Sequence, residues 1–259
     1  MCEPFYARSL DALEGQLQKM DKHLLYSKVF EGDDLSRLCE GLDTQAVILA
    51  GKPSETILDQ CRKLGIPVIG YNALLKDFPS VIIDNDAGAA QSAQYLLSLG
   101  HREFGFIHSP GFVNSNKRLS RFKIELHNAG LDESCLHIAC GDWSEESGYT
   151  AAGDLLTREG THITAICSSN DSMAIGALRA AHDRGLKVPE DLSIIGFDGI
   201  AQSELTTPSL TTSRVDVDAM AEATCMLLSH VIECGTNPAI HAMVSTQFLI
   251  RGSTASPKC

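Results

Sequence analysis

The sequence predicts an α/β fold built on parallel sheets, and three features of it indicate this class. Short apolar runs recur along the chain, each with the length of a strand covered on both faces. Stretches with helical periodicity follow these runs, and several of them stop at a glycine. The two patterns alternate over nearly the whole chain, as in repeated βα units whose strands lie parallel and whose crossovers are right-handed.

The individual elements are expected where these patterns stand. Strands are predicted at residues 46–50, 66–71, 81–83, 104–107, 136–139, 165–167 and 192–197. Helices are predicted at residues 54–64, 87–99, 118–129, 144–158, 171–184 and 220–234. Four glycines close predicted helices, because glycine readily adopts the left-handed conformation found there: Gly65, Gly100, Gly130 and Gly185.

Length and cysteine usage narrow the class of protein further. A chain of 259 residues can form one large domain or two lobes with a sizeable core. The first residues, MCEPFYARSL, lack the basic and apolar regions of a secretory signal, and the nine cysteines contain no CxxC pair. We therefore expect a reducing, cytoplasmic location. Cys135, His137 and Cys140 do not have a usual zinc spacing and are expected to pack in the fold, so no metal site is predicted.

The charge of the chain disfavours direct binding to nucleic acid. It has 21 basic and 33 acidic residues, which gives a formal net charge of −12. Phosphate backbones favour clustered Lys and Arg, because each contact releases counterions. No basic run here is longer than two residues, so this chain by itself is predicted to be a poor nucleic-acid binder.

Polar side chains gather directly after the predicted strands. In open α/β sheets, ligands bind beyond the carboxyl ends of the strands, near a topological switch point. The groups at these ends suit the hydroxyls of a polyol or the face of a planar ring. They are Asn72, Ser109, Arg118, Asp142, Trp143, Asn170 and Asp198.

No catalytic motif accompanies these groups. The sequence contains no GxSxG elbow, no GxxxxGK[ST] phosphate loop and no GxGxxG after a predicted strand. No pair of carboxyl groups is singled out as an acid and a base. We therefore predict no catalytic residues, no cofactor and no enzymatic activity.

The only tryptophan lies in the polar stretch GDWSEESGY, residues 141–149. Asp142 and Glu145 have the D-x-x-E spacing of a capping box, which predicts the start of a helix. This cap accounts for the acidic residues, since carboxylates are favoured at a helix N-terminus, but it does not account for Trp143.

Four stretches resemble the effector-binding region of the lactose/galactose repressor (LacI/GalR) family. They are DNDAGAAQSAQYLLSLGHREFGFI at 84–107, SSNDSMAIGALRAAHDRGLKVPEDLSIIGFDG at 168–199, TPSLTTSRVDV at 207–217 and RGST at 251–254. The resemblance implies a two-lobed type I periplasmic-binding-protein fold, with a doubly wound parallel sheet in each lobe. It places the N-terminal lobe at residues 1–83 plus 214–246 and the C-terminal lobe at 84–213 plus 247–259.

The same resemblance implies which residues contact a small ligand between the lobes. They are Arg118, Asp198, Trp143, Asn170, Asn72, Phe5, Tyr6 and Ser109. Each has a simpler alternative. Arg118 could be a solvated surface residue, Asn170 a helix N-cap and Asp198 or Asn72 a turn residue. Trp143 could staple a helix start, at least one of Phe5 and Tyr6 is expected to pack the first helix, and Ser109 lies with Asn114–Asn116 in a predicted loop.

Two departures from the family pattern matter. Arg121 stands where relatives usually have glycine, which would alter helix packing or add positive charge near the ligand. The family's first strand and its helix-turn-helix headpiece have no counterpart before the segment EPFYA. Because that strand is central in the family's sheet, its neighbours are expected to lack a partner.

Three functions can be weighed from these patterns. The first is the ligand-sensing domain of a transcriptional regulator that acts on operator DNA through a headpiece. The second is a solute-binding protein of a sugar transport system, and the third is an enzyme. The first is favoured, with a sugar, sugar phosphate or purine-like effector. A homodimer is expected, with N-terminal-lobe helices and residues 70–75 as candidate surfaces.

Overall fold

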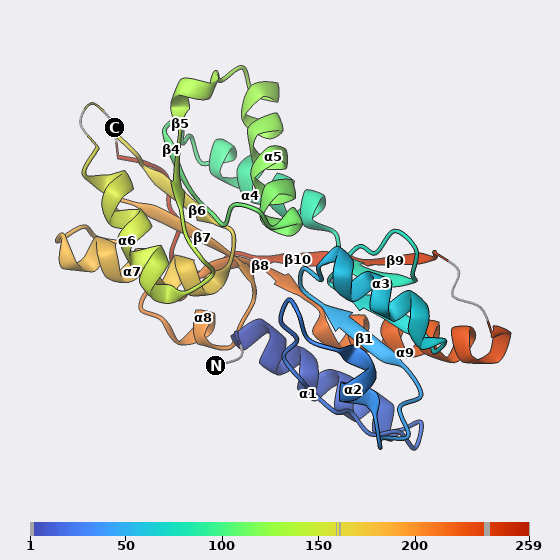
Figure 1. Cartoon of the computed structure of the whole chain (residues 1–259). Coiled ribbons are helices and arrows are strands. Elements are labelled where there is room, and N and C mark those ends of the chain that lie inside the picture. The colour runs from blue at the N-terminus through green and yellow to red at the C-terminus, as the bar shows by residue number, and fades with distance from the viewer. Residues whose placement is uncertain (1–2, 159, 161, 236–238, 259) are drawn as a thin grey trace. The chain divides into compact units, whose positions relative to one another are not determined.

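The computed structural model describes residues 3–158, 160, 162–235 and 239–258, and the chain divides into two compact units. The larger unit contains the chain up to Phe5, Asp84–Val215 and the chain from Ser245 onward. The smaller unit contains Tyr6–Ile83 and Asp216–Val244. Each unit is a sheet with helices packed against it, which confirms the predicted α/β class (Figure 1).

The sheet of the larger unit has six strands in the order β10-β8-β7-β6-β4-β5. All neighbours are parallel except β10, which runs antiparallel to β8. The strands are β4 (Phe104–His108), β5 (Leu136–Cys140), β6 (Ala165–Ser168), β7 (Ser193–Asp198), β8 (Thr211–Val215) and β10 (Thr246–Leu249).

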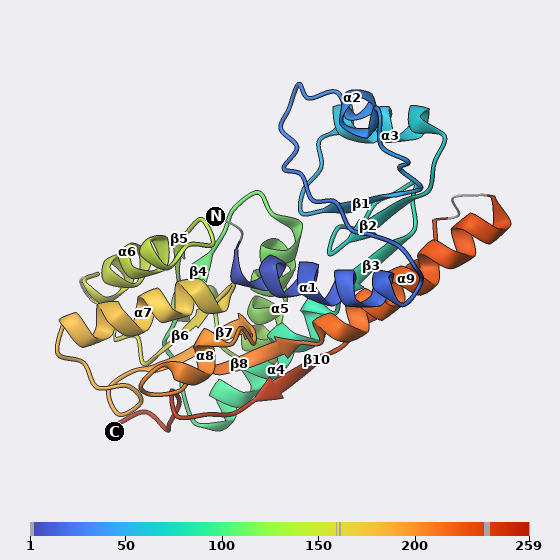
Figure 2. The ribbon, with the colours of Figure 1, turned by 90° about the horizontal axis from the view of Figure 1, so that it is seen from below.

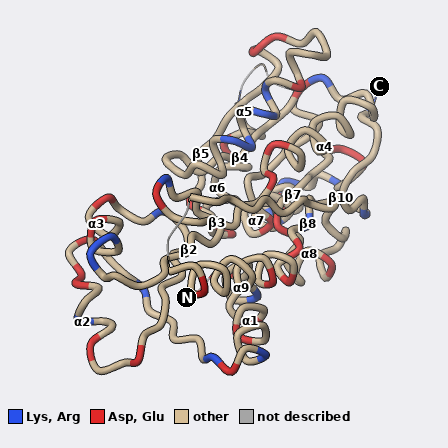
Figure 3. Tube along the Cα trace, turned by 90° about the vertical axis from the view of Figure 1, so that its right-hand side faces the viewer, with Lys and Arg blue, Asp and Glu red and all other residues tan. Residues whose placement is uncertain are grey.

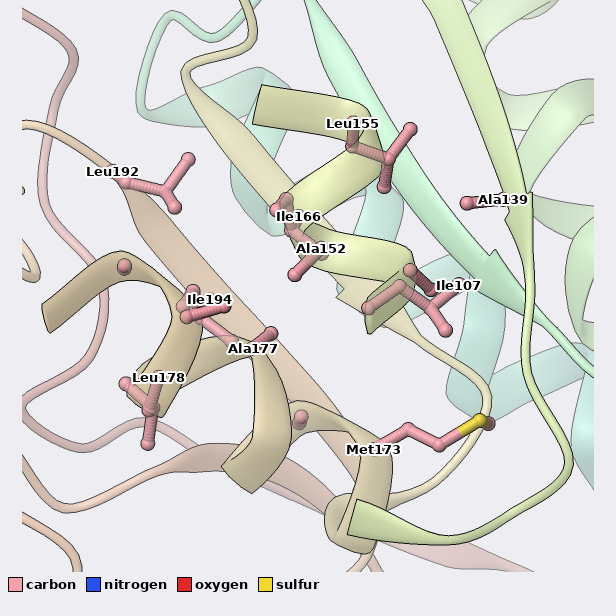
Figure 4. Packing of buried hydrophobic residues seen from close by; sticks show 14 of the residues in the cluster. Ile107, Ala139, Ala152, Leu155, Ile166, Met173, Ala177, Leu178, Leu192 and Ile194 are labelled. Carbon is pink, nitrogen blue, oxygen red and sulfur yellow. The ribbon is translucent and has the colours of Figure 1, made fainter. Parts of the chain in front are cut away.

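Helices cover both faces of this sheet, because strands such as β4, β6 and β7 are buried on both faces. They are α4 (Asn85–Ser98), α5 (Val113–Asn128), α6 (Glu145–Leu156), α7 (Asp171–Asp183) and the short α8 (Gln202–Leu205), with a 3₁₀ turn at Glu133–Cys135. Successive strand residues point to opposite faces. Ile166 packs with residues of α6 and α7, whereas Cys167 packs with residues of α4 and α5. Figure 4 shows the first of these two cores, with Leu155 of α6 and Met173 of α7 beside Ile107 and Ile166.

Helices α6 and α7 cross closely, and glycine permits the approach. A Cβ atom on Gly148 would overlap the backbone carbonyl of Met173, and one on Gly176 would overlap the backbone carbonyl of Glu145. Both glycines are therefore required by the crossing itself, whatever side chains surround them.

The smaller unit has a four-stranded parallel sheet in the order β1-β2-β3-β9. Its strands are β1 (Val47–Ala50), β2 (Val68–Tyr71), β3 (Ser80–Ile83) and β9 (His241–Val244). Its helices are α1 (Pro4–Gln18, of which the larger unit takes the residues through Phe5), α2 (Leu35–Cys39), α3 (Glu55–Leu64) and α9 (Val217–Cys234). Val68 packs in the core with α2 and α3, whereas Ile69 packs in the core with α1 and α9, which lie side by side in Figure 2.

The four predicted helix ends at glycines are confirmed, and three strands were missed. Gly65, Gly100, Gly130 and Gly185 all have positive φ at helix ends, between 68° and 98°. The missed strands are β8, β9 and β10. The sequence of β8, TTSRV, has little apolar character, although Thr211 to Ser213 are fully buried.

In the smaller unit, the neighbours of the family's first strand were expected to lack a partner. Strand β1 is an edge strand, and within the described residues no strand pairs with its outer edge. The segment 23–30 has no regular structure and exposes Leu25 and Phe30.

Residues 70–75 were predicted to offer a dimer surface, but β2 lies inside the sheet and only Leu74 of this segment is exposed.

In Figure 3, where Lys and Arg are blue and Asp and Glu red, residues of both signs are interspersed along the trace, and the sequence has 33 acidic and 21 basic residues. Among the helices described, none combines the length and the apolar character needed to cross a membrane.

Candidate functional site

The site is built at the carboxyl ends of neighbouring strands of the larger unit. Ser109 follows β4, Trp143 follows β5, Asn170 follows β6 and Asp198 ends β7. This is the edge of the sheet at which α/β folds bind ligands. The structure therefore brings four of the predicted residues to one edge, and Arg118 reaches them from α5.

Arg118 is a buried residue rather than a solvated surface arginine. Its side chain is 4% exposed, its Nε donates to Asn85 Oδ1 at 2.7 Å, and its Nη1 donates to the carbonyl of Ser169. The guanidinium carbon lies 3.5 Å from the ring centroid of Phe197, in cation–π geometry. The guanidinium is thus fixed in place from three sides.

Asp198 is the charged partner of Arg118. The Nη1 of Arg118 lies 3.5 Å from Asp198 Oδ1, and the carboxyl group is 7% exposed. The backbone at Asp198 has φ 108°, a value that L side chains rarely adopt. Burial raises the pKa of Asp198 well above its usual range, against the opposing effect of Arg118.

Asn170 combines a cap with a second set of contacts. Its Oδ1 accepts from the N–H of Met173 at 2.9 Å, so it is the N-cap of α7 as predicted. Its amide nitrogen donates to the carbonyl of Trp143 and to Glu3 Oε1, both at 3.0 Å. The side chain of Asn170 thus serves both as the N-cap and as a donor to two neighbouring groups, and it is fully buried.

Trp143 stands at a strained corner and pairs with a ring that the sequence had not indicated. Its backbone has φ 75°, which is an outlier for so large a residue. Its ring contacts Phe112 edge to face, with centroids 5.4 Å apart and planes at 88°. Phe112 is 40% exposed and precedes α5, so two aromatic rings lie at this end of the sheet.

The predicted Asp142–Glu145 capping box is wrong. The N-cap of α6 is Ser144, whose hydroxyl accepts from the N–H of Ser147 at 3.1 Å. Asp142 Oδ1 instead accepts from the N–H and the hydroxyl of Ser144, and the N–H of Asp142 donates to Ser147 Oγ. The serines can replace Glu145 because their short side chains reach the local backbone directly.

The predicted loop before Arg118 is largely helical. Helix α5 begins at Val113, so Asn114–Asn116 lie in its first turn. Ser109 is buried; its hydroxyl donates to the carbonyl of Gly141, and its N–H donates to Ser115 Oγ. Ser115 also contacts His108 and Ser169 at 2.8 Å, so its hydroxyl joins the ends of β4 and β6 to α5.

Glu3 is a further acidic group of the site, and no sequence motif points to it. It belongs to the larger unit and accepts from the amide of Asn170. Burial raises its pKa, against the effects of Asn170 and then Arg118. The charge of Glu3 also raises the pKa of Asp198, which places the two carboxyl groups within electrostatic reach of each other.

Three other residues were predicted to contact the ligand, and one residue departs from the family pattern. Phe5 is buried, as its packing alternative predicted. Asn72, with φ 51°, and Tyr6 belong to the smaller unit, and a ligand role for them stays a prediction. Arg121, the departure from the family pattern, forms an i,i+4 ion pair with Glu125 on α5.

Among the described residues, no group of three His, Cys, Asp or Glu side chains is placed to hold a metal ion. Cys135 and Cys140 are free cysteines, the first buried in the core and the second exposed. The site therefore offers hydrogen-bonding groups, one guanidinium, carboxyl groups and aromatic rings.

Asp171, next to Asn170, provides a prediction about pH. Thr212 Oγ1 and the N–H of Ile200 donate to its two oxygens at 2.6 and 2.8 Å, yet burial raises its pKa from 3.8 to about 7. A carboxyl group with a raised folded-state pKa stabilises the fold fully below its unfolded pKa and loses this effect as the pH rises through 7. As the pH rises from 5 to 6.5, the titration of Asp171 should therefore lower the free energy of unfolding by about 2 kcal/mol.

The variant Asp171→Asn removes this titration and can keep both hydrogen bonds, because the hydroxyl of Thr212 can accept instead of donating. We expect its free energy of unfolding, relative to the natural chain, to rise by about 2 kcal/mol across that pH interval. Urea unfolding at several pH values measures the difference. A difference that does not change with pH would show that Asp171 titrates normally.

Comparisons with known proteins agree with this fold. Residues 93–254 match the family described as periplasmic binding protein-like domain. An uncharacterized HTH-type transcriptional regulator of Streptomyces limosus is 34% identical over 221 residues, which cover 81% of this chain and 62% of the relative. The HTH-type transcriptional repressor PurR of Salmonella newport is 34% identical over 184 residues, covering 70% of this chain and 54% of PurR.

A solved structure has the same fold. The LacI family transcriptional regulator of Enterococcus faecalis V583, crystallised with bound ribose, is 26% identical, with a TM-score of 0.85 over 98% of this chain and 96% of that one. The match to the family over more than half of the chain identifies the class: the chain belongs to the periplasmic-binding-protein-like domains. Within that class, it is an effector-binding domain of the LacI/GalR type. The chain spans about half to three fifths of the length of the curated relatives named here.

Proposed function

We propose that this chain is the sensing domain of a LacI-type transcriptional regulator and that it binds a small, polyhydroxylated effector. The observation that carries the proposal is the group formed by Arg118, Asp198 and Asn170 at one sheet edge, close to the Trp143–Phe112 ring pair. Carboxyl and amide groups bind hydroxyls in a defined orientation, and an aromatic face covers the apolar side of a sugar ring.

The relatives support this proposal in two respects. The curated relatives are named as HTH-type regulators, and the E. faecalis structure of the same fold contains ribose. A regulator is favoured over a solute-binding transport protein because these relatives are transcriptional regulators. We infer that the effector is bound without chemical conversion and that the protein acts in the cytoplasm.

The output of the sensor is proposed to be DNA binding by a homodimer. The charge of −12 makes direct contact of this chain with phosphates unfavourable. We infer that operator DNA is bound by helix-turn-helix segments of the whole regulator. The effector controls them by binding one arrangement of the sensing domain more tightly than another.

Ligand-dependent stabilisation tests the sensing function. A ligand at 100 times its dissociation constant adds about 2.7 kcal/mol to the stability of the folded state, which raises the midpoint of thermal unfolding by roughly 5–10 °C. Neutral mono- and disaccharides, sugar acids, sugar phosphates and purines form the screen. The proposal is wrong if no compound of these classes raises the midpoint.

The single tryptophan provides an independent test of the site. Trp143 is the only tryptophan in the sequence. Fluorescence excited at about 295 nm, where tryptophan absorbs and tyrosine hardly does, therefore reports on this corner alone. We expect the stabilising compound to change this emission with the same dissociation constant that calorimetry gives. The variant Trp143→Phe should lose the signal and bind about tenfold more weakly, through loss of stacking area. An unchanged emission with a ligand that binds would give Trp143 a packing role only.

A further inference from the structure

The site in the larger unit contains more acidic groups than basic ones. Asp171 and Asp198 are buried, Glu3 is partly buried, and the charge of Asp171 raises the pKa of Asp198. Arg118 is the cation whose charge acts on both Glu3 and Asp198. One guanidinium therefore stands beside three carboxyl groups.

Arg118 is already engaged by groups of the protein. Its Nε is directed at Asn85, its Nη1 at Ser169 and Asp198, and its flat face lies on Phe197. A phosphate or carboxylate is usually bound by an arginine that presents two parallel donors. Here Asp198 already accepts from one of the guanidinium nitrogens, so Arg118 is poorly placed to bind an anionic ligand.

Glu3 is the acidic group best placed to meet a ligand. It comes just before α1, and its Oε1 accepts from the amide of Asn170, a residue predicted to contact the effector. That hydrogen bond directs the carboxylate towards the same strand ends as Asp198. An anion placed beside Asn170 would therefore meet the negative charge of Glu3 in a partly buried setting, where like charges repel more strongly than in water.

We propose that Glu3 is a specificity-determining residue that makes this site select neutral polyhydroxylated effectors and reject anionic ones. The proposal rests on the effector-binding function proposed above and narrows its ligand class. Rejection of this kind arises from an element that opposes the wrong ligand, rather than from one more contact to the right ligand. The hydroxyls of a neutral sugar can donate to Glu3 and Asp198, whereas a sugar phosphate or sugar acid adds charge of the same sign.

Matched ligand pairs test the proposal on the natural chain. The pairs are D-ribose with D-ribose 5-phosphate, and D-glucose with D-glucose 6-phosphate and D-gluconate, supplemented by any neutral sugar from the thermal screen together with its phosphate. Calorimetric titration at pH 7.5 gives the ratio of dissociation constants for the anionic and the neutral member. We expect the anionic member of the bound pair to bind at least tenfold more weakly.

Three variants assign the discrimination to Glu3. Glu3→Gln keeps an acceptor for Asn170 and removes the charge, so the ratio should fall at least fivefold, through tighter binding of the anion. Glu3→Asp keeps the charge and should retain most of the ratio. Glu14→Gln, a charge change at an exposed position of α1, the helix that follows Glu3, is the control and should leave the ratio unchanged.

Each outcome decides between the two proposals. If a sugar phosphate or sugar acid binds the natural chain as tightly as its neutral partner, the selectivity is wrong while the sensing function stands. The role of Glu3 is also wrong if Glu3→Gln leaves the ratio unchanged. If neither member of any pair binds and no compound stabilises the chain, the sensing function itself is wrong, and the role of Glu3 falls with it.

Discussion

Replacement of Arg118 by methionine is expected to lower the free energy of unfolding by about 3–5 kcal/mol and to weaken effector binding at least tenfold. The loss arises because Asp198, which is 7% exposed, would remain buried without its cation. Asp198 can escape this penalty only by taking up a proton. The destabilisation should therefore be larger at pH 8 than at pH 5, and urea unfolding at both values measures it.

Two further variants identify the source of the loss. In Arg118→Met with Asp198→Asn, the buried charge is absent, and we expect more than half of the lost stability to return while binding stays weak. Lys117→Met changes a partly exposed charge at the next position of α5 and should stay within about 0.5 kcal/mol of the natural chain. If Arg118→Met were as mild as Lys117→Met, the ion pair would have no structural role.

Replacement of Gly176 by alanine is expected to lower the free energy of unfolding by about 3 kcal/mol, at the upper end of the usual cost of overpacking. The added Cβ would overlap the carbonyl of Glu145 and lie 2.5 Å from the backbone nitrogen of Tyr149. Backbone atoms cannot rotate aside as a side chain can, so α6 and α7 must move apart. Because Asn170 caps α7 and Trp143 precedes α6, effector affinity should fall as well.

Gly153→Ala is the matched control for this crossing. Gly153 also lies in α6, but its Cβ would meet the end of the flexible Arg184 side chain, with Nη2 at 2.5 Å. Alanine gains roughly 0.5–1 kcal/mol of helix stability over glycine, which offsets the shift of Arg184. Urea unfolding should place Gly153→Ala within about 1 kcal/mol of the natural chain. Equal losses for the two variants would contradict a backbone crossing at Gly176.

The parts of the fold that were predicted from sequence are those with a local physical signal. Apolar runs such as the one that forms β7, and glycines such as Gly65 with φ 68°, carry their structure in neighbouring residues. Strand β10 lacks this signal. It is a strand because β8 pairs with it from a distant part of the chain, and short mixed sequences such as TQFL do not encode that partner.

The candidate site was predicted in the same uneven way. The residues directly after strands, such as Asn170 and Asp198, could be placed because the topology of α/β sheets dictates where strand ends meet. Asn85 and Phe112 could not, because their roles depend on how α4 and α5 pack in three dimensions. A charged residue near the start of the chain, Glu3, carries no sequence signal that would link it to a position 167 residues away.

The corner at Trp143 also bears on how this protein could change over evolution. A left-handed backbone costs a residue with a side chain roughly 1–2 kcal/mol relative to glycine, and the serine cap that follows holds the backbone there whatever ring the residue carries. Glycine or asparagine at this position would remove the backbone cost and would also lose the packing of the ring against the core and against Phe112. A laboratory variant of this domain that has lost Trp143 should therefore be checked for loss of sensing, whatever its stability.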